Sequence, residues 1–357
     1  MRALAANTDP IYLDRGQFSA MDRFFLGFIR DKRDLPFVYL TLKISLFMIP
    51  LGVMLYFPLA GWLWWMVAVA YHIFNNFVFK GPFGLMLHCT SHRRLYRQKY
   101  NYLNYYLPWV VGPFFGQSPE TYFSHHLGMH HVENNLEEDL SSTMHYQRDS
   151  VKGFASYFLK FLFLGVYETV HYFDVRRSHK LRNKLLRGEI TFFIFCGLLA
   201  WVNLPATIAV FIIPFFISRL IMMVGNWAQH SFVDAADPGN CFKNSITCIN
   251  TLYNKKCWND GYHINHHLQP SMHYTQYPIH FRENLKEFSE NKALVFEGIH
   301  FLHVWLYLMT KNYKKLCAHL VNLNGMFASE EEAIQLMKYR TAKIPLPQTS
   351  SLEGAMG

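Results

Sequence analysis

Nine of the 19 histidines fall in four short stretches of the sequence, at spacings that suit metal binding. They are His88 and His92 in HCTSH, His126, His130 and His131 in HLGMHH, His230 in NWAQH, and His263, His266 and His267 in HINHH. Residues three and four apart share one face of a helix, so His263 can converge with His266 and with His267. His266 and His267 point away from each other, which suits two metal ions better than one.

The number and type of these residues indicate which metal they would bind. Neutral imidazole is a good ligand of zinc, copper, nickel and iron. Zinc takes four ligands, of which catalytic sites use three from the protein, so nine histidines are too many for one zinc and suit two iron ions. Soluble di-iron enzymes use Glu and Glu-x-x-His motifs inside a bundle, and nothing here follows that pattern. The other histidines stand alone, and we interpret them as ordinary core or surface residues.

The distribution of apolar residues predicts an integral membrane protein. No Asp, Glu, Lys or Arg occurs between residues 44 and 79 or between residues 190 and 218. A helix needs about 20 apolar residues to cross the hydrocarbon core. The histidines at 126–131 and those at 263–267 can share metal ions only if an even number of spans separates them. We therefore predict two hairpins, made of the spans 36–57, 61–79, 190–204 and 206–225.

The placement of basic residues predicts the orientation. The chain carries a net charge of +9, and its basic clusters flank the hairpins while the turns between spans carry no charge. By the positive-inside rule, both termini and the histidine groups are expected in the cytoplasm. A basic surface facing anionic headgroups accounts for the charge, so we expect no nucleic-acid partner. The six cysteines form no C-x-x-C pair and are expected to be free thiols.

The fold class predicted is an all-α membrane protein with a cytoplasmic helical cap that carries the metal site. We divide the chain into a cytoplasmic lead-in (1–35), a membrane domain (36–310) and a cytoplasmic tail (311–357), which we expect to be disordered from Thr341. Residues 103–117 are too short to span and are expected to form a re-entrant or interface-lying segment, and 151–173 and 293–310 are expected to be helices at the membrane interface.

Polar and aromatic side chains of the second span have two interpretations each. His72, Asn75 and Asn76 are interpreted as helix–helix hydrogen-bonding groups in preference to catalytic ones. Trp62, Trp64 and Trp65 could line a substrate tunnel, as could the aromatic residues of 103–117, but we favour an interfacial belt for the tryptophans.

At its histidines the chain resembles the membrane fatty acid desaturase/hydroxylase superfamily. The boxes at 88–92, 126–131 and 263–267 match that superfamily in order and rough separation, and the four-span layout matches as well. The resemblance covers about residues 35–310. In the stearoyl-CoA desaturase branch, a His four residues after an Asn precedes the last box. The similarity of NWAQH implies that His230 is a ninth ligand and that Asn226 binds through water.

One spacing departs from this resemblance. The second box of desaturases usually reads H-x-x-H-H, whereas three residues separate His126 from His130 here. The same spacing occurs in alkane monooxygenase-like relatives. His125 cannot restore the usual spacing, because it lies further still from His130.

The resemblance implies an enzyme that uses O₂ and two iron ions to oxidise an unactivated C–H bond. We interpret the chain as a desaturase of lipid-linked or thioester-linked fatty acyl chains. The alternative is a hydroxylase or ketolase of alkyl chains, sphingolipids or carotenoids. No catalytic residue is assigned beyond the metal ligands, and Asp139, Asp260 and Asn265 are candidate hydrogen-bond acceptors for the ligands.

The sequence also bears on the electron donor, on the substrate and on a transport function. No His-Pro-Gly-Gly haem-binding motif occurs, so a separate ferredoxin or cytochrome is expected to supply electrons, and the basic face suits an acidic donor. The substrate is expected to be a long apolar chain that enters from the bilayer. A metal transporter would carry histidines inside its spans, and only His72 lies in one, so we disfavour that function.

Overall fold

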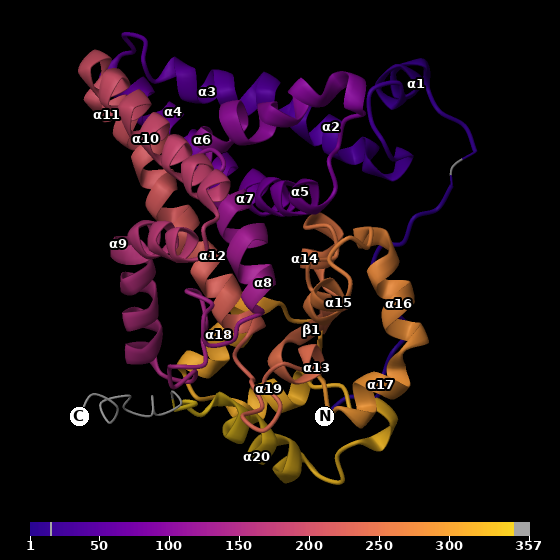
Figure 1. Cartoon of the computed structure of the whole chain (residues 1–357). Helices are drawn as coiled ribbons and strands as arrows, with labels where there is room; N and C mark the ends of the chain where they lie inside the picture. The colour runs from indigo at the N-terminus through magenta and orange to yellow at the C-terminus, as the bar shows by residue number, and fades with distance from the viewer. Residues whose placement is uncertain (15, 346–357) are drawn as a thin grey trace, which may run out of the picture.

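The computed structural model describes residues 1–14 and 16–345, and it is mainly helical. Figure 1 shows two layers, an upper helical bundle and a lower cap, with α12 running from one into the other. The bundle contains α1 (Ala20–Leu26), α2 (Leu35–Lys43), α3 (Ile49–Met54), α4 (Gly61–Ile73), α6 (Gly112–Phe114), α10 (His179–Val202), α11 (Leu204–Thr207) and α12 (Ile213–Gln229). At and below its lower face lie α5 (Lys80–His92), α7 (Thr121–His125), α8 (His131–Glu133) and α9 (Val151–Val175).

The cap is built from the C-terminal third of the chain. Its helices are α13 (Cys241–Asn244), α14 (Leu252–Lys256), α15 (His263–Leu268), α16 (Tyr277–Glu283), α17 (Leu285–Glu290), α18 (Phe301–Met309), α19 (Tyr313–His319) and α20 (Glu330–Thr341). It also holds two strands, β1 (Ile246–Ile249) and β2 (Leu294–Glu297), which pair in parallel with Ile246 opposite Leu294. The expectation of an all-α fold is therefore wrong in this detail. All residues of both strands are buried, and a short apolar run of this kind cannot be distinguished from a buried helix by its pattern.

Three helices of the described chain are long and apolar enough to cross a membrane, namely Lys32–Met54, His179–Val202 and Leu204–Gln229. They coincide with three of the four predicted spans. The predicted span 61–79 is also helical, as α4 continued by a π-helical turn at Phe74–Phe79, but it is not one of the three. Because its tryptophans, His72 and two asparagines lower its mean hydropathy, the fourth crossing stays a prediction.

The second hairpin differs from the predicted one in where its first helix begins. The span predicted at 190–204 is short because basic residues precede it, yet α10 begins at His179 and takes these residues into its first turns. The helix thereby gains the length that a crossing requires. The turn is built by Asn203, whose side chain accepts a hydrogen bond from the backbone of Ala206, and by Pro205 in the first turn of α11.

The segments predicted at the membrane interface fold in different ways. Residues 151–173 are helical as predicted, within α9. Residues 103–117 form short helical turns that end at Gly116, whose φ of 73° lets the chain pass so close to α12 that a Cβ would lie 2.1 Å from the Phe215 nitrogen. The prediction for 293–310 is wrong in part. Residues 294–297 form β2, and α18 packs against α12 with Val304 and Leu308 fully buried.

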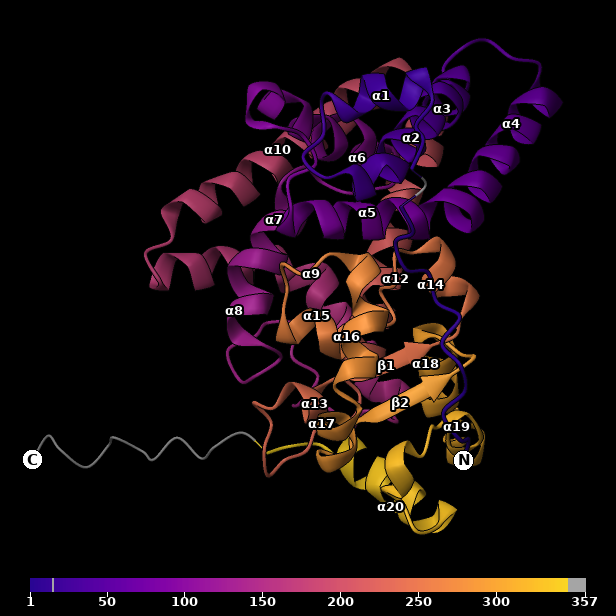
Figure 2. The same ribbon diagram turned by 90° about the vertical axis from the view of Figure 1, so that its right-hand side faces the viewer.

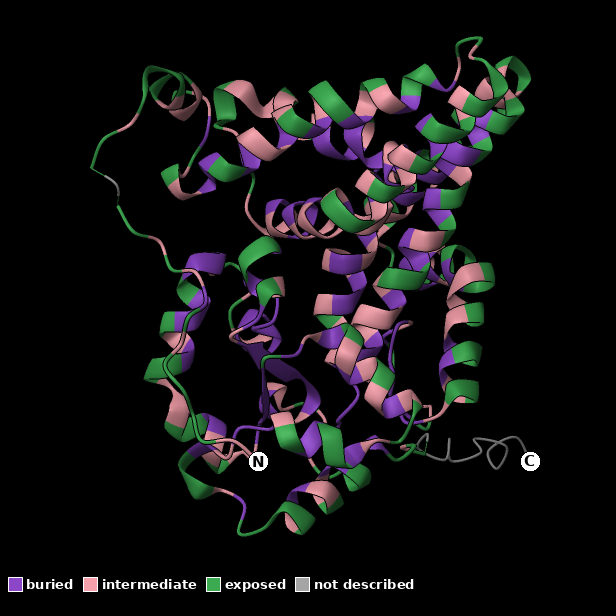
Figure 3. Ribbon diagram, turned by 180° about the vertical axis from the view of Figure 1, so that it is seen from behind, coloured by how far each residue is buried: buried purple, intermediate pink, exposed green. Residues whose placement is uncertain are grey.

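Both ends of the described chain lie in the cap. The Arg2 nitrogen donates to the Leu320 carbonyl at 2.8 Å, and the Ile344 nitrogen donates to the Met144 carbonyl at 2.9 Å. Figure 3 shows the buried interior of the cap, to which α19 and α20 contribute Leu316 and Met337. The described part of the predicted tail is thus ordered within the cap, and residues 346–357 lie outside the described residues.

Candidate metal centre

The first histidine box lies on α5, directly beneath the upper bundle. Figure 2 shows α5 lying across the underside of the bundle, turned away from the direction of α4. The change of direction occurs at the π-helical turn Phe74–Phe79, a common cause of helix bending. His88 and His92 are one helical turn apart on α5, so their rings lie on one face with centroids 5.3 Å apart.

The second box contains a π-helical turn, and this turn explains its unusual spacing. Residues His126–His130 form the turn, and the His131 nitrogen donates to the His126 carbonyl five residues earlier. A π-helical turn accommodates one more residue than an α-helical turn. His131 therefore comes back over His126, with their Nε2 atoms 3.1 Å apart. The wider helical turn thus accommodates the three residues between His126 and His130 and still brings the rings of the second box together.

The third box lies on α15, opposite the end of α12. His263 and His267 are one turn apart, with Nε2 atoms 3.0 Å apart, and His263 Nε2 lies 3.1 Å from His230 Nε2 just beyond α12. His266 points to the other side of α15, as the sequence spacing predicts. Its Nε2 lies 3.0 Å from His88 Nε2 and 2.9 Å from His131 Nε2.

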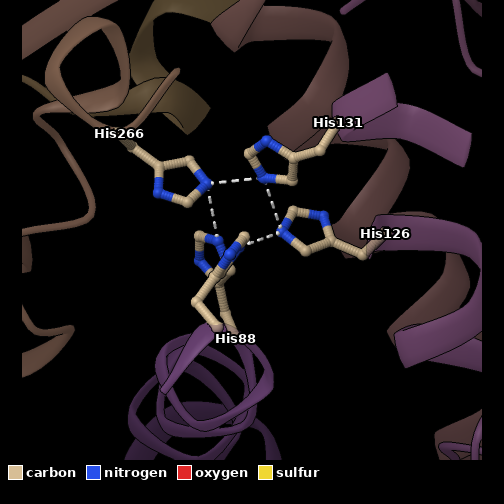
Figure 4. Close-up of side chains that lie close together, drawn as sticks. His88, His126, His131 and His266 are labelled. Carbon is tan, nitrogen blue, oxygen red and sulfur yellow. Dashed lines mark hydrogen bonds between the residues drawn. The ribbon is translucent and has the colours of Figure 1, made fainter. Parts of the chain in front are cut away.

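The nine predicted histidines form two adjacent groups. The five-histidine cluster consists of His88, His92, His126, His131 and His266, and the four-histidine cluster consists of His130, His230, His263 and His267. Within each cluster one ring nitrogen per residue lies within 4.8 Å of all the others. Figure 4 shows His88, His126, His131 and His266 pointing toward one another from α5, from the second box and from α15.

The hydrogen bonds of the Nδ1 atoms decide which nitrogen faces the interior of each cluster. His130 Nδ1 lies 2.7 Å from the Asp139 carboxylate, and His230 Nδ1 lies 2.9 Å from the Asn244 carbonyl. In the five-histidine cluster, His88 Nδ1 lies 3.4 Å from Asp260 Oδ1, and His266 Nδ1 lies 3.2 Å from the Tyr277 hydroxyl. An acceptor at Nδ1 holds the ring proton there and leaves a lone pair on Nε2.

This arrangement fits a metal ion in each cluster. Lone pairs on Nε2 atoms about 3 Å apart repel one another unless a cation lies between them. Two imidazole nitrogens bound about 2.1 Å from one ion at right angles are themselves about 3.0 Å apart. The observed separations of 2.9–3.1 Å agree with that value.

Burial keeps the imidazoles in the neutral form that binds metals. It lowers the pKa of His92 to about 3 and that of His230 to about 4, and nearby imidazoles act in the same direction. Burial likewise lowers the pKa of His126, His131, His263, His266 and His267, with neighbouring histidines as the second cause. Asp139 is buried but keeps its charged form. Although burial opposes its ionisation, its interactions with His130 hold the pKa of the carboxyl below its usual range.

Other predicted residues are placed differently. Asn226 lines the cavity beside the clusters, and its amide donates to the Ser141 carbonyl at 2.9 Å and to the Tyr157 hydroxyl at 2.7 Å. Its role as a ligand through water stays a prediction. Of the three candidate acceptors, Asp139 and Asp260 contact ring nitrogens of the clusters, whereas the amide of Asn265 lies against His280.

Sequence reasoning missed two acceptors that hold ligand histidines. Asn244 follows α12 by a loop, and Tyr277 begins α16. Neither residue lies at a spacing that relates it to a histidine box. Only the folded cap brings Asn244 to His230 and Tyr277 to His266.

A cavity of about 320 Å³ adjoins both clusters. His88 and His126 of the five-histidine cluster and His130 and His263 of the four-histidine cluster line one end of it. Its further lining comes from α5, α12 and the segment 115–117. Trp62, Trp64 and Trp65 are not part of this lining, and Trp62 and Trp65 are largely exposed, which favours the interfacial belt.

Replacing Asp139 by asparagine is expected to weaken metal binding about 10- to 100-fold, because the change removes the charged acceptor that orients His130. Whichever way the amide turns, its NH₂ group would face donors, either His130 and the Asn135 nitrogen or the nitrogen and hydroxyl of Ser141. Iron retained after dialysis against a graded chelator series measures the effect. Glu138→Gln, on an exposed neighbour that pairs with Arg176, is the matched control. Equal iron retention in both variants would contradict the role of Asp139.

Comparison with known proteins adds one finding to this geometry. Residues 63–298 match the family model described as fatty acid desaturase. This match covers all four histidine stretches and both strands of the cap. Neither the curated proteins nor the solved structures contain a significant match to the chain.

Proposed function

Because the chain belongs to the fatty acid desaturase family, we propose that it introduces a double bond into fatty acyl chains that are linked to a lipid or a thioester. Members of this family are oxidoreductases that act on lipids. The observation that carries the proposal is the convergence of nine histidines from four stretches into two adjacent clusters beside a cavity.

In this proposal each cluster holds one iron ion. The ligands are His88, His92, His126, His131 and His266 for one ion and His130, His230, His263 and His267 for the other, with Asn226 binding through water. Bound iron supplies the oxidising power needed to break an unactivated C–H bond with O₂ as oxidant. The overall reaction converts –CH₂–CH₂–, O₂, two electrons and two protons into –CH=CH– and two water molecules.

The chain's own residues orient the site and keep it dry. Asp139, Asn244, Asp260 and Tyr277 hold the Nδ1 protons, so the Nε2 lone pairs face inward. Six of the nine cluster histidines are less than 9 % exposed, among them His230 at 0 % and His263 at 3 %, which limits the access of bulk water. The cavity beside them positions the methylene groups that react.

The architecture supports four membrane crossings with the site in the cytoplasm. The N-terminus, all three boxes and the described C-terminal residues lie on the cap side of the bundle, which requires an even number of crossings. In this proposal the helix at 61–79 is the fourth crossing, in addition to the three most apolar helices. The basic residues at the cap-side end of α10 agree with a cytoplasmic cap, to which a separate ferredoxin or cytochrome would bring electrons.

Hydroxylation or ketone formation by the same site is the second candidate. The spacing of the second box is the one sequence feature in its favour. Since the π-helical turn at His126–His130 accommodates the additional residue and brings His131 against His126, the spacing does not by itself favour an alcohol product over an alkene.

Mass-spectrometric lipid profiling of a host that expresses the chain tests the proposal. A His266→Ala variant is the control, because His266 Nε2 lies between those of His88 and His131. We expect a new double bond only with the intact chain. A hydroxylated product that the variant lacks would establish the second candidate instead. If neither product forms, iron content decides: two iron ions per chain would retain the oxidase chemistry, and one zinc or no metal would overturn it.

A further inference from the structure

The cavity has a polar end that faces away from most of the histidines. Lys80 lies there, at the start of α5, eight residues before His88. Eight residues of α-helix rise about 12 Å. Lys80 and His88 therefore line the same cavity two helical turns apart. The oxidation proposed above uses no group at this end.

Lys80 is a buried cation without a buried counter-ion. The residue is 7 % exposed, and its Nζ lies 2.8 Å from the Ser218 hydroxyl and 3.4 Å from the Phe115 carbonyl, with no carboxylate of a described residue in ion-pair range. The Phe115 ring, with its centroid 5.9 Å from Nζ, adds a weak cation–π contact, but two neutral oxygens and a ring supply no negative charge to pair with the ammonium. Burying an unpaired charge is costly, so lysines inside proteins are normally paired.

Neighbouring polar groups at this end are also incompletely satisfied. Asn76 lies one turn before Lys80 and lines the cavity, and its buried Oδ1 accepts no hydrogen bond from any residue that the structure describes. The Gln117 amide, which lines the same cavity, donates to the sulfur of Met222, a weak acceptor. The Asn76 amide donates to the His72 carbonyl of its own helix at 3.0 Å, so the interpretation of Asn76 as a helix–helix hydrogen-bonding group is wrong for this residue. A cavity built only for a hydrocarbon chain would gain nothing from these groups.

The helix surface next to Lys80 in sequence is apolar and exposed. Phe77, between Asn76 and Lys80 in sequence, is 83 % exposed on the surface of the bundle, and Val78 is exposed as well. Large apolar side chains exposed on a membrane helix face lipid. Lys80 thus follows directly on an exposed apolar stretch of the helix, at the bend between α4 and α5.

We propose that Lys80 binds the carbonyl oxygen at the head of the substrate acyl chain, so that the head lies at the polar end and the chain extends toward the histidine clusters. The inference rests on the proposed function for the identity of the chain, and it adds the direction in which the chain binds. The position of reaction is then counted from the carbonyl group and is set by the rise from Lys80 to His88. A carboxylate would also neutralise the ammonium, whereas an ester or thioester would supply only the acceptor.

Native mass spectrometry of the purified full-length protein tests this inference without iron or an electron donor. The probes are stearic acid, methyl stearate and octadecane, which share a chain and differ in the head. We expect wild type to bind both oxygenated probes more tightly than octadecane. Lys80→Met should weaken stearic acid binding about tenfold or more and leave octadecane unchanged. Lys99→Met, on an exposed lysine outside the cavity lining, should bind as wild type does.

Each outcome of this experiment has a distinct meaning. Equal binding of all three probes by wild type would overturn the inference, and this comparison does not depend on the folding of any variant. Unchanged binding of both oxygenated probes by Lys80→Met would overturn it as well. If methyl stearate binds as tightly as stearic acid, the head is an ester or thioester carbonyl; tighter binding of stearic acid assigns a carboxylate. Because binding needs no turnover, lack of oxidised product would affect the proposed function alone.

Discussion

Replacing His263 by alanine is expected to abolish product formation and to remove the metal ion of the four-histidine cluster. His263 Nε2 lies 3.1 Å from that of His230 and 3.0 Å from that of His267, so the change removes the central donor of this cluster. Three histidines would remain, whereas the five-histidine cluster would keep all of its donors. Removing a hydrogen-bond partner of a ligand already lowers metal affinity about 10- to 100-fold. Removing the ligand itself should therefore lower metal affinity by more than about 100-fold. Metal content per chain should fall by half.

Elemental analysis of the purified variant, together with lipid profiling, measures both effects. His171→Ala is the matched control, because His171 is an exposed histidine on α9 that belongs to neither cluster. It should keep the metal content and the product of wild type. If His263→Ala also keeps both, the four-histidine cluster is a packing arrangement of histidines and holds no metal.

Replacing Arg148 by methionine is expected to lower the free energy of unfolding by about 3–5 kcal/mol, because it removes a buried hub of hydrogen bonds. Arg148 is fully buried. Its guanidinium donates to six carbonyl oxygens, those of Thr143, Met144, Tyr146, Ser231, Arg340 and Ala342, at 2.6–3.3 Å. These carbonyls belong to the loop after the second box, the residue after His230 and the end of α20.

Thermal unfolding of the purified protein measures the loss of stability, with an expected fall of about 10 °C in Tm. Lysine should not restore stability, since its ammonium offers only three donor hydrogens. Arg282→Met, on an exposed arginine of α16, is the control and should unfold as wild type does. Iron content of the folded fraction should be unchanged in Arg148→Met, because Arg148 contacts no histidine of either cluster. An unfolding temperature within about two degrees of wild type would show that the six carbonyls find other partners.

The sequence by itself determined the local features of this protein. Helical spacing placed His263 and His267 on one face and turned His266 away, because a helix repeats every 3.6 residues whatever surrounds it. The uncharged runs located three helices that can cross a membrane, since crossing depends on the length and composition of one segment. All nine histidines that the spacing selected lie in the two clusters.

The tertiary structure decided how the local elements combine. His130 and His131 are neighbours in sequence and point in different directions, as His266 and His267 do, but only the packing of the second box against α15 and the end of α12 places His131 beside His266 and His130 beside His230. Asn244 and Tyr277 reach their histidines only through the packing of the cap, and the parallel pairing of β1 and β2 joins segments about 50 residues apart. The polar end of the cavity likewise depends on α12 bringing Ser218 to Lys80. Contacts between distant segments leave no periodic trace in a single sequence, so they are decided when the helices pack.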